Sequence, residues 1–188
     1  KDFLHYRENH ARFVSEFGFQ GPPDPRTLER VTAPEERSPH SAVMQHHNKQ
    51  VEGMERLFRF QAAHYPVAAD WDGFFYTGQL VQADALKCAV EHWRRRKFRT
   101  AGTLFWQLND CWPVMSWSAI DADLRPKASY YAARRFFAPV LVSFAQTGGD
   151  IQVWGSNDFL VDVPSTLSLS LRSFNGDMLW RKRMRVTM

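Results

Sequence analysis

The sequence predicts a mixed α/β fold followed by a smaller all-β unit. Two apolar runs, 11–17 and 101–108, favour an extended backbone and end in polar and aromatic residues. Elsewhere in the first 140 residues, apolar side chains recur at spacings of three and four, the pattern of amphipathic helices. Beyond them the pattern changes to a period of two, which is typical of half-buried strands. The predicted order is therefore strand, helix, helix, strand, helix, then β.

The first strand lies between two segments that we expect to be loops. Residues 1–10 are polar and lead into the strand at 11–17. The segment 20–41 holds half of the ten prolines of the chain, with a single helical turn expected at 27–31. A loop of this length in a compact domain is usually functional.

Three segments are predicted to be helices: 41–63, 73–97 and 125–137. A proline follows the first and the third, and proline ends helices because it lacks a backbone N–H. The second carries the basic run 94–97 in its last turn, where cations interact favourably with the helix dipole. This dipole interaction explains the run without a phosphate ligand.

The C-terminal unit reads as antiparallel β structure. Segments 151–155 and 165–172 alternate apolar and polar residues, and Asn175-Gly176 is a strong hairpin signal. We therefore divide the chain into 1–140 and 141–188. The second part has room for three or four strands, whereas an immunoglobulin-like sandwich has about seven.

The composition excludes some classes of function. The 188 residues carry a formal net charge of +4, spread along the chain, which does not call for nucleic acid. No apolar run approaches membrane-spanning length and no signal pattern is present, so we expect no membrane partner and favour a cytoplasmic location. The chain begins at Lys1 without an initiator methionine, so we expect it to be a piece of a longer protein.

The histidines and acidic residues of the chain do not have the spacing of a metal or cofactor site. His46 and His47 are neighbours, which on a helix point about 100° apart and make a poor chelate. Asp121-Ala-Asp123 lacks the glycine and final glutamate of a calcium loop. We expect no metal and no cofactor, and we expect Cys88 and Cys111 to be buried free thiols.

Two strand ends carry the residues with catalytic and binding chemistry. Glu16 comes late in the first apolar run, and Asn109, Asp110 and Trp112 follow the second. In α/β enzymes, sites form where parallel strands end. The alternative for Glu16 is a carboxylate paired with Arg12 or left in solvent.

These stretches resemble a known family. Arg12-Phe-Val-Ser-Glu-Phe-Gly-Phe-Gln20 and Leu104-Phe-Trp-Gln-Leu-Asn-Asp-Cys-Trp112 are closely similar to the β-mannosidases of glycoside hydrolase family two. Three further pieces occur in the same order as in that family: His46-His47-Asn48-Lys49, Tyr76-Thr-Gly-Gln-Leu-Val-Gln-Ala83 and Phe136-Phe-Ala-Pro139. The resemblance extends to about Ser143 and continues weakly beyond it.

The resemblance implies a fold more specific than the patterns do. It implies that 1–140 is the C-terminal part of a TIM (β/α)8 barrel and that 141–188 begins an immunoglobulin-like β-sandwich. A complete barrel takes roughly 250 residues, so we expect an incomplete one. Its two open sheet edges predict self-association.

The resemblance also implies roles for individual residues. Glu16 matches the nucleophile, and Trp106 matches the tryptophan that forms a floor under the sugar. Asn109 and Asp110 would bind hydroxyls or orient their neighbours. Trp112 and His47 are expected to contact the sugar at the rim of the site; the alternative for Trp106 is a place in the core.

The partner carboxylate of a retaining glycosidase is not found in this sequence. The acid/base of the family is a Glu that follows an Asn, and the chain contains no Asn-Glu dipeptide. Asp110 is the nearest local carboxylate and a poor candidate. We therefore expect the parent protein to remove terminal β-mannose from β-mannoside oligosaccharides and the isolated chain to be inactive.

Two other interpretations of the sequence remain open. Another family-two β-glycosidase, such as a β-galactosidase, β-glucuronidase or glucosaminidase, would share much of the pattern, although Gln107-Leu-Asn-Asp110 favours a mannosidase. The chain could instead be a non-catalytic fragment or a carbohydrate-contacting module.

Overall fold

The computed structural model describes residues 1–68 and 70–188 and divides the chain into two units. Unit 1 spans Lys1–Phe137 and unit 2 spans Ala138–Met188. The sequence placed the division between residues 140 and 141. None of the helices in the described part of the chain is long and apolar enough to cross a lipid bilayer.

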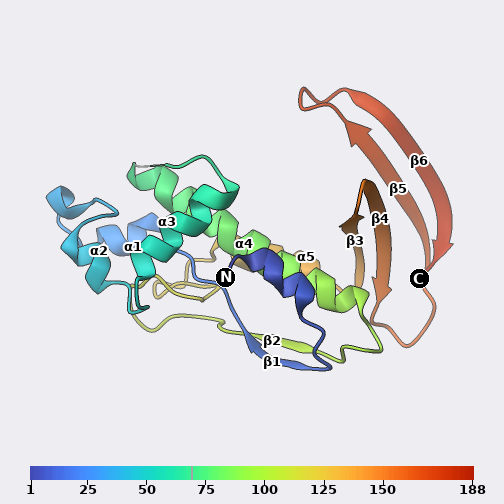
Figure 1. Cartoon of the computed structure of the whole chain (residues 1–188), viewed down its shortest axis with the longest axis horizontal. Helices are drawn as coiled ribbons and strands as arrows, with labels where there is room; N and C mark the ends of the chain where they lie inside the picture. The colour runs from blue at the N-terminus through green and yellow to red at the C-terminus, as the bar shows by residue number, and fades with distance from the viewer. Residues whose placement is uncertain (69) are drawn as a thin grey trace. The chain divides into compact units, whose positions relative to one another are not determined.

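Unit 1 combines helices with a small parallel sheet, as the mixed α/β prediction required (Figure 1). Its elements, in order, are η1 (Phe3–Glu8), β1 (Val14–Phe17), α1 (Pro25–Glu29), η2 (Pro34–Glu36), α2 (Ala42–His46), α3 (Gly53–His64), α4 (Trp71–Arg95), β2 (Thr103–Phe105) and α5 (Ala128–Phe136).

The sheet of unit 1 is the parallel pair β1–β2. Val14 lies opposite Thr103 and Phe17 opposite Phe105. Three steps along β1 therefore match two steps along β2, so β1 carries one extra residue between these pairs. Such bulges re-aim the side chains beside them.

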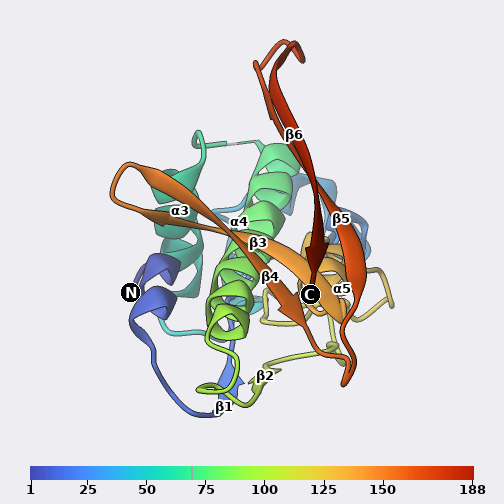
Figure 2. The same ribbon diagram turned by 90° about the vertical axis from the view of Figure 1, so that its right-hand side faces the viewer.

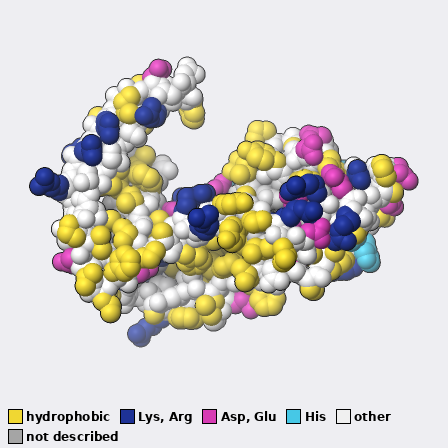
Figure 3. All heavy atoms as spheres, turned by 180° about the vertical axis from the view of Figure 1, so that it is seen from behind, with side chains coloured by type: hydrophobic (Ala, Val, Ile, Leu, Met, Phe, Trp, Pro, Cys, Tyr) yellow, Lys and Arg dark blue, Asp and Glu magenta, His cyan; other side chains and the backbone are white. Residues whose placement is uncertain are grey.

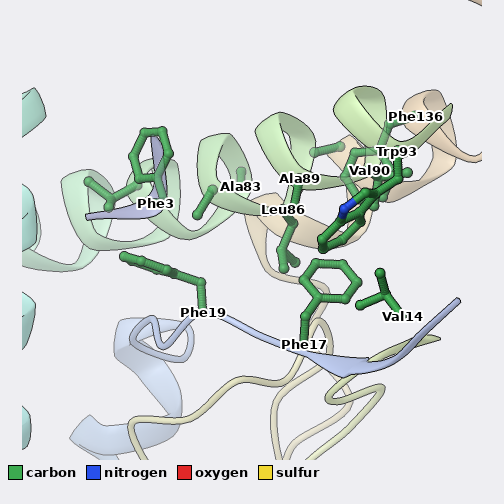
Figure 4. Close-up of a cluster of buried hydrophobic side chains, with 13 residues drawn as sticks. Phe3, Val14, Phe17, Phe19, Ala83, Leu86, Ala89, Val90, Trp93 and Phe136 are labelled. Atoms are coloured by element: carbon green, nitrogen blue, oxygen red, sulfur yellow. The ribbon is translucent and has the colours of Figure 1, made fainter. Parts of the chain in front are cut away.

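Helix α4 covers one face of this sheet. Val14, Phe17 and Phe19 point from the β1 segment toward α4, as Figure 4 shows. Phe17 packs edge-on against Trp93, with ring centroids 4.7 Å apart. Leu86 of α4 is fully buried in the same cluster. Burying side chains of this size contributes about 1.5–3 kcal/mol each, so this cluster anchors the sheet to the helix.

A second apolar cluster lies under the shorter helices. Figure 2 shows α3 beside the N-terminal half of α4. Buried residues of α1, α2, α3, α4 and the loop after β2 form this cluster: Leu28, Met44, Met54, Leu57, Phe74, Phe75 and Met115.

The prediction of one helix over 41–63 is wrong. The structure has two helices there, α2 and α3, with a turn between them. The side chain of Asn48 accepts a hydrogen bond from the backbone N–H of Gln50 at 3.1 Å, which stabilises the turn. Glu52 then takes a left-handed backbone conformation, with φ 55°. A Cβ on Gly53 would lie 2.1 Å from the Asn48 Oδ1 atom, so α3 begins at the residue that permits this approach.

Other boundaries shift for local reasons. Residues 3–8 form a 3-10 helix where a loop was expected, because the Asp2 carboxylate caps Leu4 and Phe3 is buried. Helix α4 begins at Trp71 because Asp70 caps it. The two strands of unit 1 are shorter than predicted, and Cys111 is exposed rather than buried because it lies in the loop after β2.

Unit 2 consists of two antiparallel hairpins, β3–β4 and β5–β6. The strands are β3 (Val140–Thr147), β4 (Asp150–Asn157), β5 (Pro164–Arg172) and β6 (Met178–Thr187). Gly148 and Gly176 occupy the turns with φ of 61° and 96°, conformations that favour glycine. The turn predicted at Asn175-Gly176 is confirmed, whereas β3 was not predicted as a strand.

The β5–β6 hairpin has one apolar and one polar face. Residues paired across the hairpin share a face. On the apolar face, Leu167, Leu169 and Leu171 lie opposite Met184, Lys182 and Trp180. On the other, Thr166, Ser168 and Ser170 lie opposite Arg185, Arg183 and Arg181. The Lys and Arg side chains along this hairpin are visible in dark blue in Figure 3.

Candidate functional site

Glu16 lies near the C-terminal end of β1 with an exposed side chain. Val14 and Phe17, at the two ends of the bulge, are both buried against α4, whereas Ser15 and Glu16 between them are exposed. The Glu16 carboxylate therefore lies on the face opposite α4. Among the described residues, no group forms a hydrogen bond or ion pair with it, so it is free to meet a ligand.

Trp106 lies immediately beyond β2 and is held against the end of β1. Its backbone N–H donates to the Phe17 carbonyl at 2.7 Å. Phe105 packs with the core under α4, so Trp106 follows it onto the opposite face, with 49% of the residue exposed. Glu16 and Trp106 therefore flank the Phe17–Phe105 pair and lie on the same face of the sheet.

The chain turns closely at Gly18, just after Glu16. A Cβ on Gly18 would lie 2.3 Å from the carbonyl oxygen of Trp106 and 3.0 Å from the Trp117 ring. The Tyr6 hydroxyl donates to the Gly18 carbonyl at 2.7 Å. Burial raises the pKa of this phenol to about 12, so Tyr6 stays a neutral donor at physiological pH.

Asp110 is buried inside the loop that follows β2. Its Oδ2 atom accepts hydrogen bonds from the hydroxyls of Ser116 at 2.7 Å and Ser118 at 2.6 Å. Its Oδ1 atom accepts from the Gln107 side chain at 3.2 Å. Of the two roles predicted for Asp110, this geometry supports the orienting one, since Gln107 directly follows Trp106. Asn109 is exposed, and its amide donates to the Asp110 carbonyl at 3.3 Å.

His47, at the end of α2, and Trp112, in the loop after β2, form an aromatic pair. Their rings stack with centroids 5.2 Å apart, and the ammonium of Lys49 lies 5.5 Å from the Trp112 ring. The Nδ1 atom of His47 lies 2.6 Å from the Pro113 carbonyl. A carbonyl only accepts, so Nδ1 carries the proton and Nε2 presents a lone pair when the ring is neutral.

The turn after β1 connects the strand that carries Glu16 to the segment that carries His47. The Gln20 amide donates to the Asn48 Oδ1 atom at 2.9 Å and to the Met115 carbonyl at 3.1 Å. Met115 in turn donates its N–H to the His47 carbonyl at 2.8 Å. Two of the stretches that resembled the family, 12–20 and 46–49, thus meet at Met115 of the loop after β2 in one hydrogen-bonded region.

Sequence reasoning missed the buried polar residues that hold this region. Gln82 of α4 is fully buried and donates to the carbonyls of Phe19 and Ser118 at 3.0 and 3.1 Å. Lys127 is also fully buried, and burial lowers the pKa of its amine to about 7. Gln82 lies in the matching piece 76–83 but was given no role, and Lys127 carried no sequence signal, because polar residues of such segments usually face solvent.

The described residues contain no group of three or more His, Cys, Asp or Glu side chains that could hold a metal ion. Asp121, part of the discounted calcium-like run, is fully buried. Its carboxylate accepts from the Thr27 hydroxyl at 2.6 Å and from the backbone N–H groups of Asp24, Asp123 and Arg125. These protein donors explain its burial.

Comparison with known proteins identifies the relatives of this chain. No family model matches it. Two curated relatives are named β-mannosidase B: one from Aspergillus niger is 38% identical over 136 residues, and one from Aspergillus clavatus is 30% identical over 191 residues, or 93% of this chain. This chain is a homologue of part of the β-mannosidases. The family resemblance carried by the strand-end motifs is thereby confirmed.

Solved structures agree with this relationship. A crystal structure of a β-D-mannosidase from Dictyoglomus thermophilum is 37% identical, with a TM-score of 0.85 over the whole of this chain. An exo-chitosanase from Amycolatopsis orientalis has a TM-score of 0.81 at 18% identity, which shows a common fold alone. The chain spans 24% of the mannosidase structure and 16–23% of the two Aspergillus β-mannosidases.

Proposed function

We propose that this chain is the part of a retaining β-mannosidase that supplies the catalytic nucleophile, Glu16. The observation that carries the proposal is the pairing of β1 with β2, which puts an unpartnered carboxylate and the exposed Trp106 ring on one face. The β-mannosidase relatives support the same reaction class.

The chemistry assigned to Glu16 is nucleophilic catalysis. A Glu16 carboxylate oxygen would attack the anomeric carbon of a terminal β-mannoside, forming a glycosyl ester as the bond to the leaving-group oxygen breaks. A general acid protonates that oxygen, and the same group then activates the water that hydrolyses the ester.

The general acid would come from outside this chain. Asp110 is a poor candidate because both its oxygens accept hydrogen bonds from groups inside its own loop. General acid catalysis typically contributes about 10²–10⁴-fold. We therefore propose that the chain alone does not turn over ordinary mannosides, although a substrate whose leaving group needs no proton could still react with Glu16.

The proposed sugar contacts come from two places. Trp106 would support the apolar face of the mannose beside Glu16, and Asn109 would meet its hydroxyls. Trp112 and His47 would contact the sugar at the rim, where the Nε2 lone pair of neutral His47 can accept from a hydroxyl. Asp110 would act by orienting Gln107 and the loop.

We also propose a finer fold than mixed α/β. Residues 1–140 would be the C-terminal part of a (β/α)8 barrel, because β1 and β2 are parallel and helices cover only one face. On the open face, Leu104 and Trp106 are exposed at alternate positions. Residues 141–188 would begin an immunoglobulin-like sandwich, since the β5–β6 hairpin has a single apolar face.

Both outer edges of the two-stranded β1–β2 sheet lack a strand partner among the described residues. Such edges template pairing with further strands. We therefore propose that the isolated chain self-associates. Light scattering tests this: oligomers are expected, and a stable monomer would contradict the half-barrel picture.

A panel of aryl glycosides tests the proposed reaction in the intact protein, meaning the longest natural polypeptide that contains this chain. We expect the aryl β-mannoside to be cleaved faster than the β-galactoside, β-glucuronide and β-glucosaminide. Glu16→Gln should abolish this activity, whereas Glu8→Gln, an exposed residue of η1, should retain it. Preference for another sugar would assign the chain to a different β-glycosidase.

A further inference from the structure

Lys127 is a buried amine whose contacts join the two segments that carry the proposed site. We propose that Lys127 is a positioning residue that holds Glu16 and Trp106 in one arrangement. This inference rests on the proposed function, since it assigns Lys127 to the same site. Lys127 itself is not placed near the sugar.

The Lys127 amine has three acceptors around it. Nζ lies 3.0 Å from the Gly21 carbonyl, 3.4 Å from the Ser116 carbonyl and 3.5 Å from the Ser118 hydroxyl. An ammonium has three N–H donors, so these acceptors match it in number. The backbone N–H of Lys127 also donates to the Ala119 carbonyl at 2.9 Å, which fixes the start of the side chain.

One line of contacts runs from Lys127 to the end of β1. Gly21 and Ser116 exchange both backbone hydrogen bonds, at 2.8 and 3.2 Å. The Lys127 amine lies against both of their carbonyls, so it ties this pair to the start of α5. Gly21 is only five residues after Glu16, and the Gln20 side chain between them is held by two further hydrogen bonds.

The other line runs to the end of β2. The Ser118 hydroxyl, beside the Lys127 amine, donates to Asp110 at 2.6 Å. Asp110 accepts from the Gln107 side chain, and the Gln107 backbone N–H donates to the Trp117 carbonyl at 3.1 Å. Gln107 directly follows Trp106, so this line ends at the ring expected to support the sugar.

Packing alone does not account for a lysine at this position. Burying an ammonium costs several kcal/mol, and an apolar side chain of similar length would avoid that cost. What lysine adds is a set of donors directed at two loops. Displacements of about 1 Å at a catalytic group can cost 10²-fold in rate, so a residue that fixes both loops has a large effect on catalysis.

The test uses the intact protein and measures a rate for each active molecule. A 2-deoxy-2-fluoro-mannosyl fluoride labels the nucleophile without needing a general acid, because fluoride leaves unprotonated. The observed inactivation rate constant does not depend on how much of a variant has folded. We would compare Lys127→Met with Lys182→Met, an exposed lysine of β6, and with the natural protein.

We expect Lys127→Met to lower the inactivation rate constant about tenfold to a hundredfold, with Lys182→Met unchanged. Equal rate constants for the two variants would overturn the inference while leaving Glu16 as nucleophile. If the natural protein itself is not labelled, the proposed function fails first. If Lys127→Met does not fold, Ser118→Ala is tested instead, because it removes the hydroxyl that links the Lys127 amine to Asp110. An unchanged inactivation rate constant for Ser118→Ala would overturn the inference.

Discussion

The backbone N–H of Trp106 donates to the carbonyl of Phe17 at 2.7 Å, so the residue after Glu16 holds the residue that follows β2. This contact links the two proposed partners in sugar binding through the backbone. Any change that moves one strand end therefore moves the other.

Gly18→Ala tests how closely the strand ends must approach. The new methyl would lie 2.3 Å from the Trp106 carbonyl oxygen, a contact that forces the backbone to shift. We expect a destabilisation of about 1–3 kcal/mol and loss of aryl β-mannosidase activity in the intact protein. Hydrogen exchange of peptides from β1 and β2 measures the first effect. Gly149→Ala, with open space around it, is the control and should change neither.

Asp110→Asn tests the buried acceptor in the loop after β2. Asparagine has one acceptor oxygen, so if that oxygen keeps the Ser116 and Ser118 hydroxyls, the new NH2 group faces the Gln107 amide, which loses its acceptor at Oδ1. The expected cost is about 1–3 kcal/mol, seen as a lower denaturant midpoint by tryptophan fluorescence. Asp150→Asn, at the exposed start of β4, should leave the midpoint in place. Equal midpoints for the two variants would mean that Asp110 does not organise the loop.

The Lys127 amine predicts a pH dependence of stability. Burial lowers its pKa to about 7 from an ordinary value of 10.5. Between these values the unfolded chain binds more protons than the folded one, so the free energy of unfolding rises with pH across this window. Lys127→Met should lose this component of the rise. The two proteins are compared by hydrogen exchange in the loop after β2, measured across this pH window and corrected for intrinsic exchange. Parallel pH profiles for the natural protein and Lys127→Met would contradict the prediction.

His47 should be protonated on Nδ1 in its neutral form, because that atom lies 2.6 Å from the Pro113 carbonyl. Nitrogen NMR of the ring distinguishes the two tautomers directly. His47→Phe keeps an aromatic ring against Trp112 but loses the hydrogen bond and the Nε2 acceptor. We expect a higher KM for the aryl β-mannoside in the intact protein. An unchanged KM would remove His47 from the sugar contacts.

Sequence reasoning succeeded where a local pattern determines the structure. Helix α4 was expected from its apolar periodicity, and the β5–β6 turn from Asn175-Gly176. It failed at α2 and α3, where the Asn48 side chain interrupts a continuous apolar pattern. Asn48 is also held by the Gln20 amide, 28 residues away, and no local sequence pattern predicts a contact that forms only after folding.

The candidate site was predictable in part for the same reason. Glu16 and Trp106 follow apolar strands, so their placement at adjacent strand ends could be expected once the strands were found. The buried positions of Lys127 and Gln82 could not, because each depends on carbonyls contributed by distant loops. Their hydrogen-bond partners exist only in the assembled fold.

Covalent trapping tests the central assignment most directly. The intact protein would be treated with the 2-deoxy-2-fluoro-mannosyl fluoride, digested, and its peptides sequenced by mass spectrometry. We expect one fluoromannosyl adduct, on Glu16, and none in Glu16→Gln. An adduct on another carboxylate, or none in a protein that cleaves β-mannosides, would contradict it.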